Sequence, residues 1–300
     1  MNTIGIDLGS NTLRVVKIDC NNLEKIAEYE KIVRTAQDIV DKKIISKDTI
    51  KRVKDALAEA KMVVNFDNSL VRAVATEALR VAKNSLEVLE EIKQEFGVEF
   101  EIIDAKEEAI LTLLAVKMRL KKFGINKDFI LVDIGGGSTE ITLNIKDKVY
   151  TKSFSLGIVT VANSANSIEE IKILIKSYNQ DIKEFLKDFD LENLIFVSTA
   201  GTPTTIAALK HNLNYKTYNA NIVNGTKLTI NDLDIYLNKL LEMSKEQREL
   251  AVGVGRDDLI IAGILIFKNL YKLLNKKESI VIDDGLREGV AISLCEKDSK

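Results

Sequence analysis

The sequence predicts an α/β fold in which two domains each carry β-sheets covered by helices. Segments with strand-like and helix-like periodicity alternate along all 300 residues, and helices interleaved with strands in this way are typical of helix-covered sheets. The chain is also longer than one hydrophobic core usually serves. The best boundary is the turn FGINKD at 123–128. We therefore expect domains over 1–124 and 125–300, with a last helix that could pack back on the first domain.

In the first half, alternation of apolar residues predicts strands and a 3.6-residue period predicts helices. The predicted strands are 3–8, 13–19, 25–35, 69–76 and 98–104. The predicted helices are 46–66, 84–97 and 104–120, with a short helical turn in 75–84. Ser46 is a candidate N-cap, and Gly97 is a typical C-terminal stop signal.

The second half repeats this alternation. The predicted strands are 129–134, 138–145, 148–155, 194–199 and 279–283. The predicted helices are 167–187, 202–211, 229–242, 257–275 and a last helix from about residue 284. No segment rich in Pro, Gly or Ser separates these elements, and Pro203 is the only proline.

Composition excludes several classes of function. The formal net charge of −2 provides no basic field, so we expect neither a nucleic-acid partner nor an anionic-membrane partner. The longest apolar run, 259–267, is too short to span a bilayer. Cys20 and Cys295 lie near opposite ends of the chain, which fits neither a disulfide framework nor a cysteine metal cluster. With no signal-peptide pattern at the N-terminus, these features predict a protein of the reducing cytoplasm.

The single histidine, His211, restricts the chemistry further. Histidine-rich zinc sites, Ser-His-Asp triads and metal phosphohydrolases with a His-Asp pair all need residues that this chain lacks. His211 is interpreted as an ordinary residue at the end of a helix. Any catalysis is therefore expected to depend on carboxylates, together with a metal ion.

A short motif occurs in both halves: DLGSNTLR at 7–14 aligns without gaps to DIGGGSTE at 133–140. Each copy lies between two apolar strands and predicts a tight hairpin, whose glycines would permit positive φ and close approach of a ligand. Backbone N–H groups in such a turn suit phosphate oxygens. Asp7 and Asp133 could bind a divalent cation, and Ser138 and Glu140, two positions apart in a strand, are expected on the same face. A plain hairpin with solvated acids is the alternative, but two aligned copies favour paired phosphate sites.

Three further segments contain candidate residues. Asp104 and Glu107 resemble a helix capping box, whereas Glu108 lies inside the first turn, where it is either a solvated acid or a group that can deprotonate water. Arg80 is either a surface residue or a bidentate phosphate ligand. The segment 198–209 predicts a strand, a glycine turn and a helix N-terminus, which is another potential anion site. No P-loop sequence is present, which excludes Walker-type ATP chemistry.

Taken together, these motifs resemble the exopolyphosphatase and guanosine pentaphosphate phosphohydrolase family, within the superfamily of actin, sugar kinases and heat-shock ATPases. The segments that carry the resemblance, in chain order, are IDLGSNTLRVV, ATEALRVAKN, EIIDAKEEA, VDIGGGSTEI, SLGIVT, STAGTPTTIAAL, RDDLIIAG and DDGLREGVA. The resemblance implies two ribonuclease-H-like (actin-like ATPase) domains, with mixed sheets covered by helices, that flank a central cleft. It also implies the short form of the family, without additional C-terminal helical domains.

The resemblance also assigns roles to individual residues. Glu108 corresponds to the catalytic base for the attacking water, and Glu140 to a second catalytic acid that helps to place the water or the metal. Asp133 corresponds to a metal-associated aspartate. Arg80 corresponds to an arginine that neutralises terminal phosphates. The remaining implied phosphate-binding residues are Asp7, Ser10, Asn11, Gly135, Gly136, Gly137 and Ser138.

The implied activity is hydrolysis of the terminal phosphoanhydride bonds of inorganic polyphosphate, with release of orthophosphate and dependence on Mg²⁺ or another divalent cation. Guanosine pentaphosphate is the alternative substrate. The chain has Asp104-Ala105-Lys106 where the family usually has Ser-Gly, which leaves the choice of substrate open. A phosphotransferase and a non-hydrolysing phosphate or nucleotide sensor are the remaining alternatives. Similar proteins are often dimers, so a homodimer is one expectation.

Overall fold

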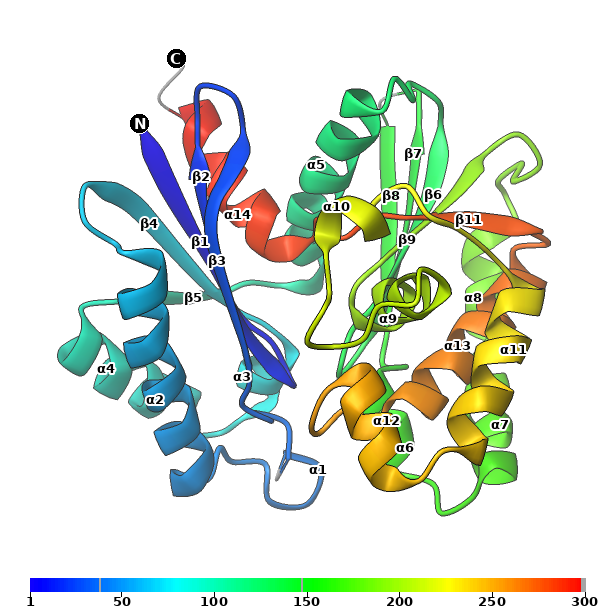
Figure 1. The fold of residues 1–300 in the computed structure, drawn as a ribbon, viewed down its shortest axis with the longest axis horizontal. Coiled ribbons are helices and arrows are strands. Elements are labelled where there is room, and N and C mark those ends of the chain that lie inside the picture. Colours follow the sequence, from blue (N-terminus) through cyan, green and yellow to red (C-terminus); the bar gives the residue numbers. More distant parts are fainter. Residues whose placement is uncertain (38, 147, 298–300) are drawn as a thin grey trace. The chain divides into compact units, whose positions relative to one another are not determined.

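The computed structural model describes residues 1–37, 39–146 and 148–297. The chain divides into two compact units. The first unit contains Met1–Met118 and Asp284–Lys300, and the second contains Arg119–Asp283. Each unit has a mixed β-sheet with helices packed on it (Figure 1), so the predicted α/β class is confirmed. The domain limits predicted at 124 and 125, and the cleft between the domains, stay predictions.

The first unit is built on a five-stranded sheet in the order β3-β2-β1-β4-β5. Its strands are β1 (Asn2–Leu8), β2 (Thr12–Asp19), β3 (Glu24–Ile32), β4 (Ser69–Ala75) and β5 (Phe100–Ile102). Its helices are α1 (Ile39–Lys42), α2 (Lys47–Val64), α3 (Glu77–Val81), α4 (Ser85–Phe96), α5 (Ala105–Lys122, which continues into the second unit) and α14 (Leu286–Lys297). β1 pairs with β2 antiparallel and with β4 parallel.

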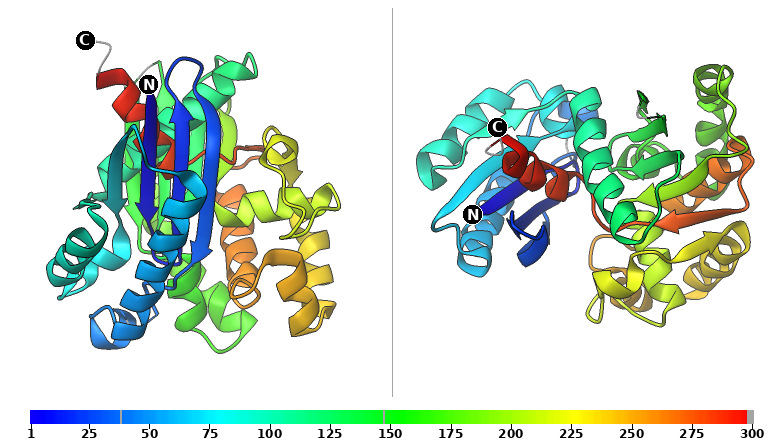
Figure 2. Two further views of the ribbon diagram at one scale, coloured as in Figure 1. Left: turned by 60° about the vertical axis from the view of Figure 1, so that its left-hand side comes forward. Right: turned by 90° about the horizontal axis from the view of Figure 1, so that it is seen from above.

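Alternate residues of this sheet face two different layers of helices. Ile4 and Ile6 of β1 pack in one core with residues of α2 and α4. On the opposite face, α14 lies against β1 (Figure 2), and Val16 packs with Ala291. Gly5 permits this contact, because a Cβ there would lie 2.1 Å from the carbonyl oxygen of Arg287. The C-terminal helix is therefore a structural part of the first unit.

The second unit is built on a six-stranded sheet in the order β10-β11-β9-β6-β7-β8. Its strands are β6 (Phe129–Ile134), β7 (Thr139–Ile145), β8 (Lys148–Phe154), β9 (Ile195–Thr199), β10 (Lys227–Thr229) and β11 (Glu278–Val281). Its helices are α6 (Ile158–Asn163), α7 (Ile168–Ser177), α8 (Asn179–Leu186), α9 (Gly201–Lys210), α10 (Ala220–Val223), α11 (Ile230–Glu242), α12 (Lys245–Val252) and α13 (Ile260–Leu273).

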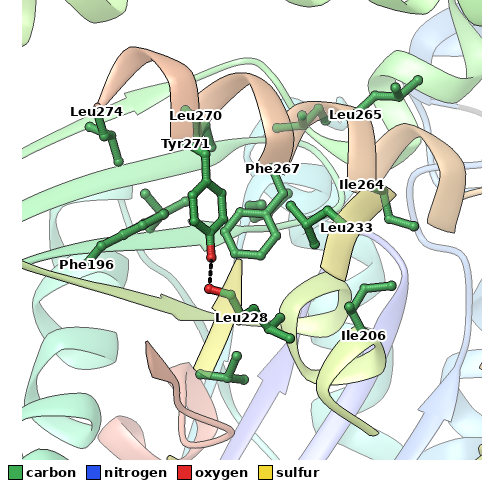
Figure 3. Packing of buried hydrophobic residues seen from close by; sticks show 14 of the residues in the cluster. Phe196, Ile206, Leu228, Leu233, Ile264, Leu265, Phe267, Leu270, Tyr271 and Leu274 are labelled. Carbon is green, nitrogen blue, oxygen red and sulfur yellow. Dashed lines mark hydrogen bonds between the residues drawn. The ribbon is translucent and has the colours of Figure 1, made fainter. Parts of the chain in front are cut away.

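The core of the second unit is centred on α13 (Figure 3). The rings of Phe267 and Tyr271 on this helix lie 5.9 Å and 4.9 Å from the ring of Phe196 on β9. Tyr271 is fully buried, and its hydroxyl donates a 2.7 Å hydrogen bond to the carbonyl of Leu228. The hydroxyl of Tyr271 is the polar group of this aromatic cluster, and the bond gives it a partner inside the core.

The sequence located most elements but not all of their limits. Gly97 ends α4 in the left-handed conformation, as predicted. The predicted helix 167–187 is divided into α7 and α8 at Tyr178, and α12 was missed. Ser46 is the N-cap of α2, but its side chain makes no capping hydrogen bond. None of the helices in the described ranges combines the length and the apolar character needed to cross a bilayer.

The prediction about the cysteines was wrong. Cys20 and Cys295 form a disulfide, with a Cα–Cα distance of 5.4 Å across 275 positions of sequence. Their separation in sequence was misleading because α14 returns to β1, and this brings Cys295 beside the end of β2. The cysteines therefore no longer support a reducing compartment, and the cytoplasmic location stays a prediction.

Candidate functional site

The two copies of the repeated motif fold into hairpins with the same turn. In the first unit, the N–H of Gly9 donates to the carbonyl of Thr12 at 3.0 Å. In the second unit, the N–H of Gly135 donates to the carbonyl of Ser138 at 2.9 Å. These are equivalent positions in the alignment of 7–14 with 133–140, so the repeat seen in the sequence is a repeat of backbone structure.

Strand pairing places charged residues opposite one another beside each turn. Asp7 of β1 is the cross-strand partner of Arg14 in β2. At the equivalent position, Asp133 of β6 is the partner of Glu140 in β7. Residues directly opposite in an antiparallel pair share one face of the sheet. Asp133 and Glu140 therefore lie on the same face, whereas Asp7 shares its face with a cation.

Carbonyl groups of the second turn are bound by the segment that begins α6. Ile158 donates its N–H to the carbonyl of Gly135 at 3.0 Å, and Val159 donates to Gly136 at 2.8 Å. Within the described residues, the structure gives no acceptor for the N–H groups of Gly136 and Gly137. A turn with its carbonyls bound and its N–H groups available is suited to an anion.

The first turn is arranged in the same way. Val33 and Arg34 both donate their N–H groups to the carbonyl of Asn11 at 2.9 Å. Ala36 donates to the carbonyl of Ser10 at 2.8 Å. The side chains of Ser10 and Asn11 are buried. In both hairpins, the chain segment that follows binds the carbonyl groups of the turn. With its carbonyls occupied, each turn is suited to a ligand that accepts hydrogen bonds.

One of the two reasons predicted for the glycines, positive φ, was wrong. Within the described chain, Gly9 and the glycines of 135–137 are not among the residues with positive φ. The other reason, close approach of a ligand, stays a prediction, but the turn is closely approached by a third glycine-containing segment. A Cβ on Gly157, at the start of α6, would lie 2.2 Å from the carbonyl oxygen of Gly136 and 2.3 Å from the carbonyl carbon of Gly137. Gly157 therefore packs directly on the backbone of the glycine turn.

Glu140 is a buried carboxylate held by two hydroxyls. Ser138 donates a 2.7 Å hydrogen bond to Oε1 of Glu140, and Ser153 donates a 2.6 Å bond to the same oxygen. The predicted common face of Ser138 and Glu140 is therefore confirmed. Ser153 was missed, because its proximity depends on the register of β8, in which it pairs with Glu140. Two fixed donors hold the carboxylate in one orientation.

The donors beside the second turn fit a hard divalent cation. Asp133 and Glu140 are carboxylates at opposed positions on one sheet face, and Mg²⁺ is commonly held by one or two carboxylates together with waters and substrate phosphates. No cluster of three or more His, Cys, Asp or Glu suited to a metal occurs in the part of the chain that the structure describes. Asp133 and Glu140 could therefore supply two carboxylate ligands, with water or a bound anion in the remaining positions.

In the first unit, the candidate residues follow the carboxyl ends of three neighbouring parallel strands. Leu8 at the end of β1 pairs with Ala75 of β4, which pairs with Ile102 of β5. The first hairpin turn, helix α3 with Arg80, and the start of α5 with Glu108 follow these three strand ends. This edge of a sheet is where α/β proteins usually bind ligands.

Arg80 and Glu108 are in direct contact. Nη1 of Arg80 donates to Oε2 of Glu108 at 2.9 Å and to the carbonyl of Ile103 at 2.8 Å. Nε and Nη2 of Arg80 donate to Oε2 of Glu77 at 3.2 Å and 3.0 Å. Burial alone would lower the pKa of Arg80, but the charge and hydrogen bonds of Glu108, together with Glu77, raise it. The guanidinium therefore lies between two carboxylates. The contact between Arg80 and Glu77 was not predicted from the sequence.

Glu107, next to Glu108, has a different partner. Asp104 caps α5 by accepting a 2.8 Å hydrogen bond from the N–H of Glu107, as expected from the sequence. The carboxylate of Glu107 does not complete a capping box, because it accepts a 2.6 Å hydrogen bond from Nη2 of Arg72. Arg72 also binds Glu101 at 2.9 Å. Two adjacent glutamates on one helix thus form separate arginine pairs.

The segment 198–209 forms the end of β9 and the start of α9, as predicted. Ala200, which precedes the helix, has φ 69° and ψ −172°, a region in which a residue with a side chain is strained by roughly 1–3 kcal/mol. The tight turn therefore depends on Ala200 rather than on Gly201. The hydroxyl of Thr204 donates to the carbonyl of Ala200 at 2.9 Å and helps to hold this conformation.

Comparison with known proteins identifies relatives over nearly the whole chain. The model of the Ppx/GppA phosphatase family matches residues 14–298. Exopolyphosphatase 2 from Mycobacterium tuberculosis is 26% identical, and the match covers 97% of both chains. A guanosine-5'-triphosphate,3'-diphosphate pyrophosphatase from Pseudoalteromonas atlantica is 24% identical over 97% of this chain and 58% of its own length.

Other relatives are longer proteins or solved structures. A bifunctional 3-dehydroquinate synthase/phosphatase from Fusobacterium nucleatum is 25% identical, and the chain spans only 44% of its length. The crystal structure of a Ppx/GppA family member from Aquifex aeolicus is 31% identical, with a TM-score of 0.78 over 100% of this chain and 99% of that one. The family match and this structural agreement lead to one conclusion: the chain belongs to the Ppx/GppA phosphatase family.

Proposed function

We propose that this protein is an exopolyphosphatase, which hydrolyses the terminal phosphoanhydride bond of inorganic polyphosphate and releases orthophosphate. The observation that carries the proposal is the pairing of Arg80 with Glu108 at 2.9 Å. It combines a cation suited to a terminal phosphate with a carboxylate suited to accept a proton from water. Relatives named exopolyphosphatase support this reaction class.

In the proposed reaction, Glu108 accepts a proton from the attacking water, and Arg80 offsets the charge of the phosphoryl group. The hairpin turns with Ser10 and Asn11, and with Gly136 and Gly137, donate hydrogen bonds to phosphate oxygens. Glu140, held by Ser138 and Ser153, orients water. Phosphoryl transfer depends mainly on such positioning and charge stabilisation.

A divalent cation is part of the proposal. Asp133 and Glu140 would hold Mg²⁺ or a similar ion, which when bound would withdraw negative charge from the phosphate oxygens. Their hard oxygen donors support this assignment over a softer metal.

Guanosine pentaphosphate is the second candidate substrate, because a relative over 97% of this chain is named for hydrolysis of that class of nucleotide. Polyphosphate is placed first because exopolyphosphatase 2 matches 97% of this chain at 26% identity, whereas the relative named for the nucleotide matches it at 24%.

The experiment incubates the purified protein with Mg²⁺ and, separately, long-chain polyphosphate, guanosine pentaphosphate and ATP, and measures released phosphate. The proposal expects release from polyphosphate, which Glu108→Gln abolishes. Glu107→Gln is the matched control, because it removes the same charge one residue away and should retain activity. Release from guanosine pentaphosphate alone would favour the second candidate. Absence of release from all three substrates by the unmodified protein would refute a hydrolase and favour a phosphotransferase or a sensor.

A further inference from the structure

The resting contacts of Arg80 pose a problem for phosphate binding. Four hydrogen bonds from its guanidinium reach acceptors in the described part of the chain, on Glu77, Ile103 and Glu108. Both hydrogens of Nη1 are used by Ile103 and Glu108. A phosphate that binds this guanidinium with two donors must therefore displace a present acceptor.

The same contact limits Glu108. A carboxylate that accepts a charge-assisted hydrogen bond from a guanidinium is a weaker base than one without that partner. Its side chain is 15% exposed, and that of Arg80 is 18% exposed, so the pair is largely removed from water. While this salt bridge persists, Arg80 has fewer donors for a phosphate, and Glu108 is less able to accept a proton from water.

We propose a salt-bridge exchange: the terminal phosphate of the substrate displaces Glu108 from Nη1 of Arg80, and Glu77 keeps the guanidinium in place during the exchange. This inference rests on the proposed function. It makes Glu108 an internal competitor of the substrate in the resting protein and a base only when a phosphate occupies Arg80. Water is then activated mainly when a substrate is present.

The arrangement of the other contacts supports this exchange. Glu77 binds Nε and Nη2, on the side of the guanidinium away from the Glu108 contact, so losing Glu108 leaves these two bonds intact. The arriving phosphate also replaces the charge that Glu108 provided. The half-buried cation thus keeps a partner throughout, which avoids the large cost of an uncompensated charge.

The exchange predicts that removing the competitor strengthens phosphate binding. Isothermal titration calorimetry would measure the Kd of imidodiphosphate, an analogue with a nitrogen bridge, for the full chain and for Glu108→Gln. We expect the variant to bind about fivefold more tightly, because the neutral amide competes less for Arg80. Glu107→Gln is the control for loss of charge, since its partner is Arg72, and its Kd should stay within about twofold of the unmodified value.

Equal Kd values for the two variants would overturn the exchange. This binding result does not depend on turnover, so it is separate from the phosphate-release test. A protein that hydrolyses polyphosphate while Glu108→Gln binds no more tightly than Glu107→Gln refutes the exchange but not the hydrolase. A protein that releases no phosphate refutes the hydrolase.

Glu77 is a positioning residue in this scheme, and a second pair of variants tests it. Glu77→Ala removes the anchor of Arg80, and we expect kcat to fall about tenfold. Glu77→Gln keeps an oxygen that accepts from the guanidinium and should recover most of kcat. If the role of Glu77 were purely structural, Glu77→Ala would lower the thermal stability and the active fraction, and Glu77→Gln would not recover kcat. Equal kcat values in the alanine and glutamine variants would contradict a positioning role.

Discussion

Gly157→Ala offers a direct test of the idea that the glycine turn must be held in one place. A Cβ at this position would lie 2.2 Å from the carbonyl oxygen of Gly136, whereas ordinary contacts begin at 3.4 Å. The turn or the start of α6 must therefore move by about 1.2 Å. Because the new contacts are to backbone atoms, no side-chain rotation can relieve them.

Two consequences are expected from this displacement. Overpacking of this kind costs about 1–3 kcal/mol of stability. A shift near 1 Å in a group that positions substrate can lower the rate on the order of 100-fold. We therefore expect kcat for polyphosphate hydrolysis to fall much more than the folded fraction does.

The assay compares phosphate release and urea denaturation for Gly157→Ala and for Gly201→Ala. Gly201 is a suitable control, because a Cβ there meets no atom within 4 Å and alanine is accepted well in a helix. The control should retain both stability and rate. If Gly157→Ala also keeps the unmodified rate, the turn tolerates displacement, and the reasoning from close approach is wrong.

Two further predictions concern stability. Reduction of the Cys20–Cys295 disulfide opens a link across 275 positions. Because the unfolded chain then gains loop entropy, the free energy of unfolding should fall by up to about 5 kcal/mol. An unchanged midpoint of urea denaturation after addition of dithiothreitol would contradict this. Burial alone would raise the pKa of Glu288, but Arg287 and Lys25 lower it to about 2. The contribution of the ionised Glu288 to folding stability, on the order of 3 kcal/mol, is therefore present above about pH 4.5 and lost as the pH falls toward 2. Glu288→Gln should flatten the acid-induced loss of stability, and an equal pH slope in both proteins would refute this role.

Local patterns were enough to predict what depends on local geometry. The common face of Ser138 and Glu140 follows from the two-residue period of a strand, and the hydrogen bond between them confirms it. The stop at Gly97 follows from the left-handed conformation that glycine adopts readily. The repeated hairpin was visible because its backbone bonds close within four residues.

Contacts between distant segments were not predictable in the same way. Ser153 reaches Glu140 only through the register of β7 and β8, which depends on the hydrophobic patterns of both strands and on the turn between them. The bond of Arg80 to Glu108 requires the ends of β4 and β5 to lie side by side. The disulfide requires α14 to return to β1. In each case the residue types were visible, but their partners depend on tertiary structure.

The charges on the two hairpins differ in a way that indicates a division of roles. Arg14 opposes Asp7 in the first hairpin and also approaches Glu30 at 3.2 Å, so the opposed positions there carry charges of both signs. In the second hairpin, Glu140 opposes Asp133, and like charges at opposed positions destabilise a sheet. The two serine hydroxyls on Glu140 offset some of that cost. A protein retains opposed carboxylates at the expense of stability where function needs them, and carboxylate pairs of this kind suit a divalent cation. This difference favours the second hairpin over the first as the place for the divalent cation of the proposed function.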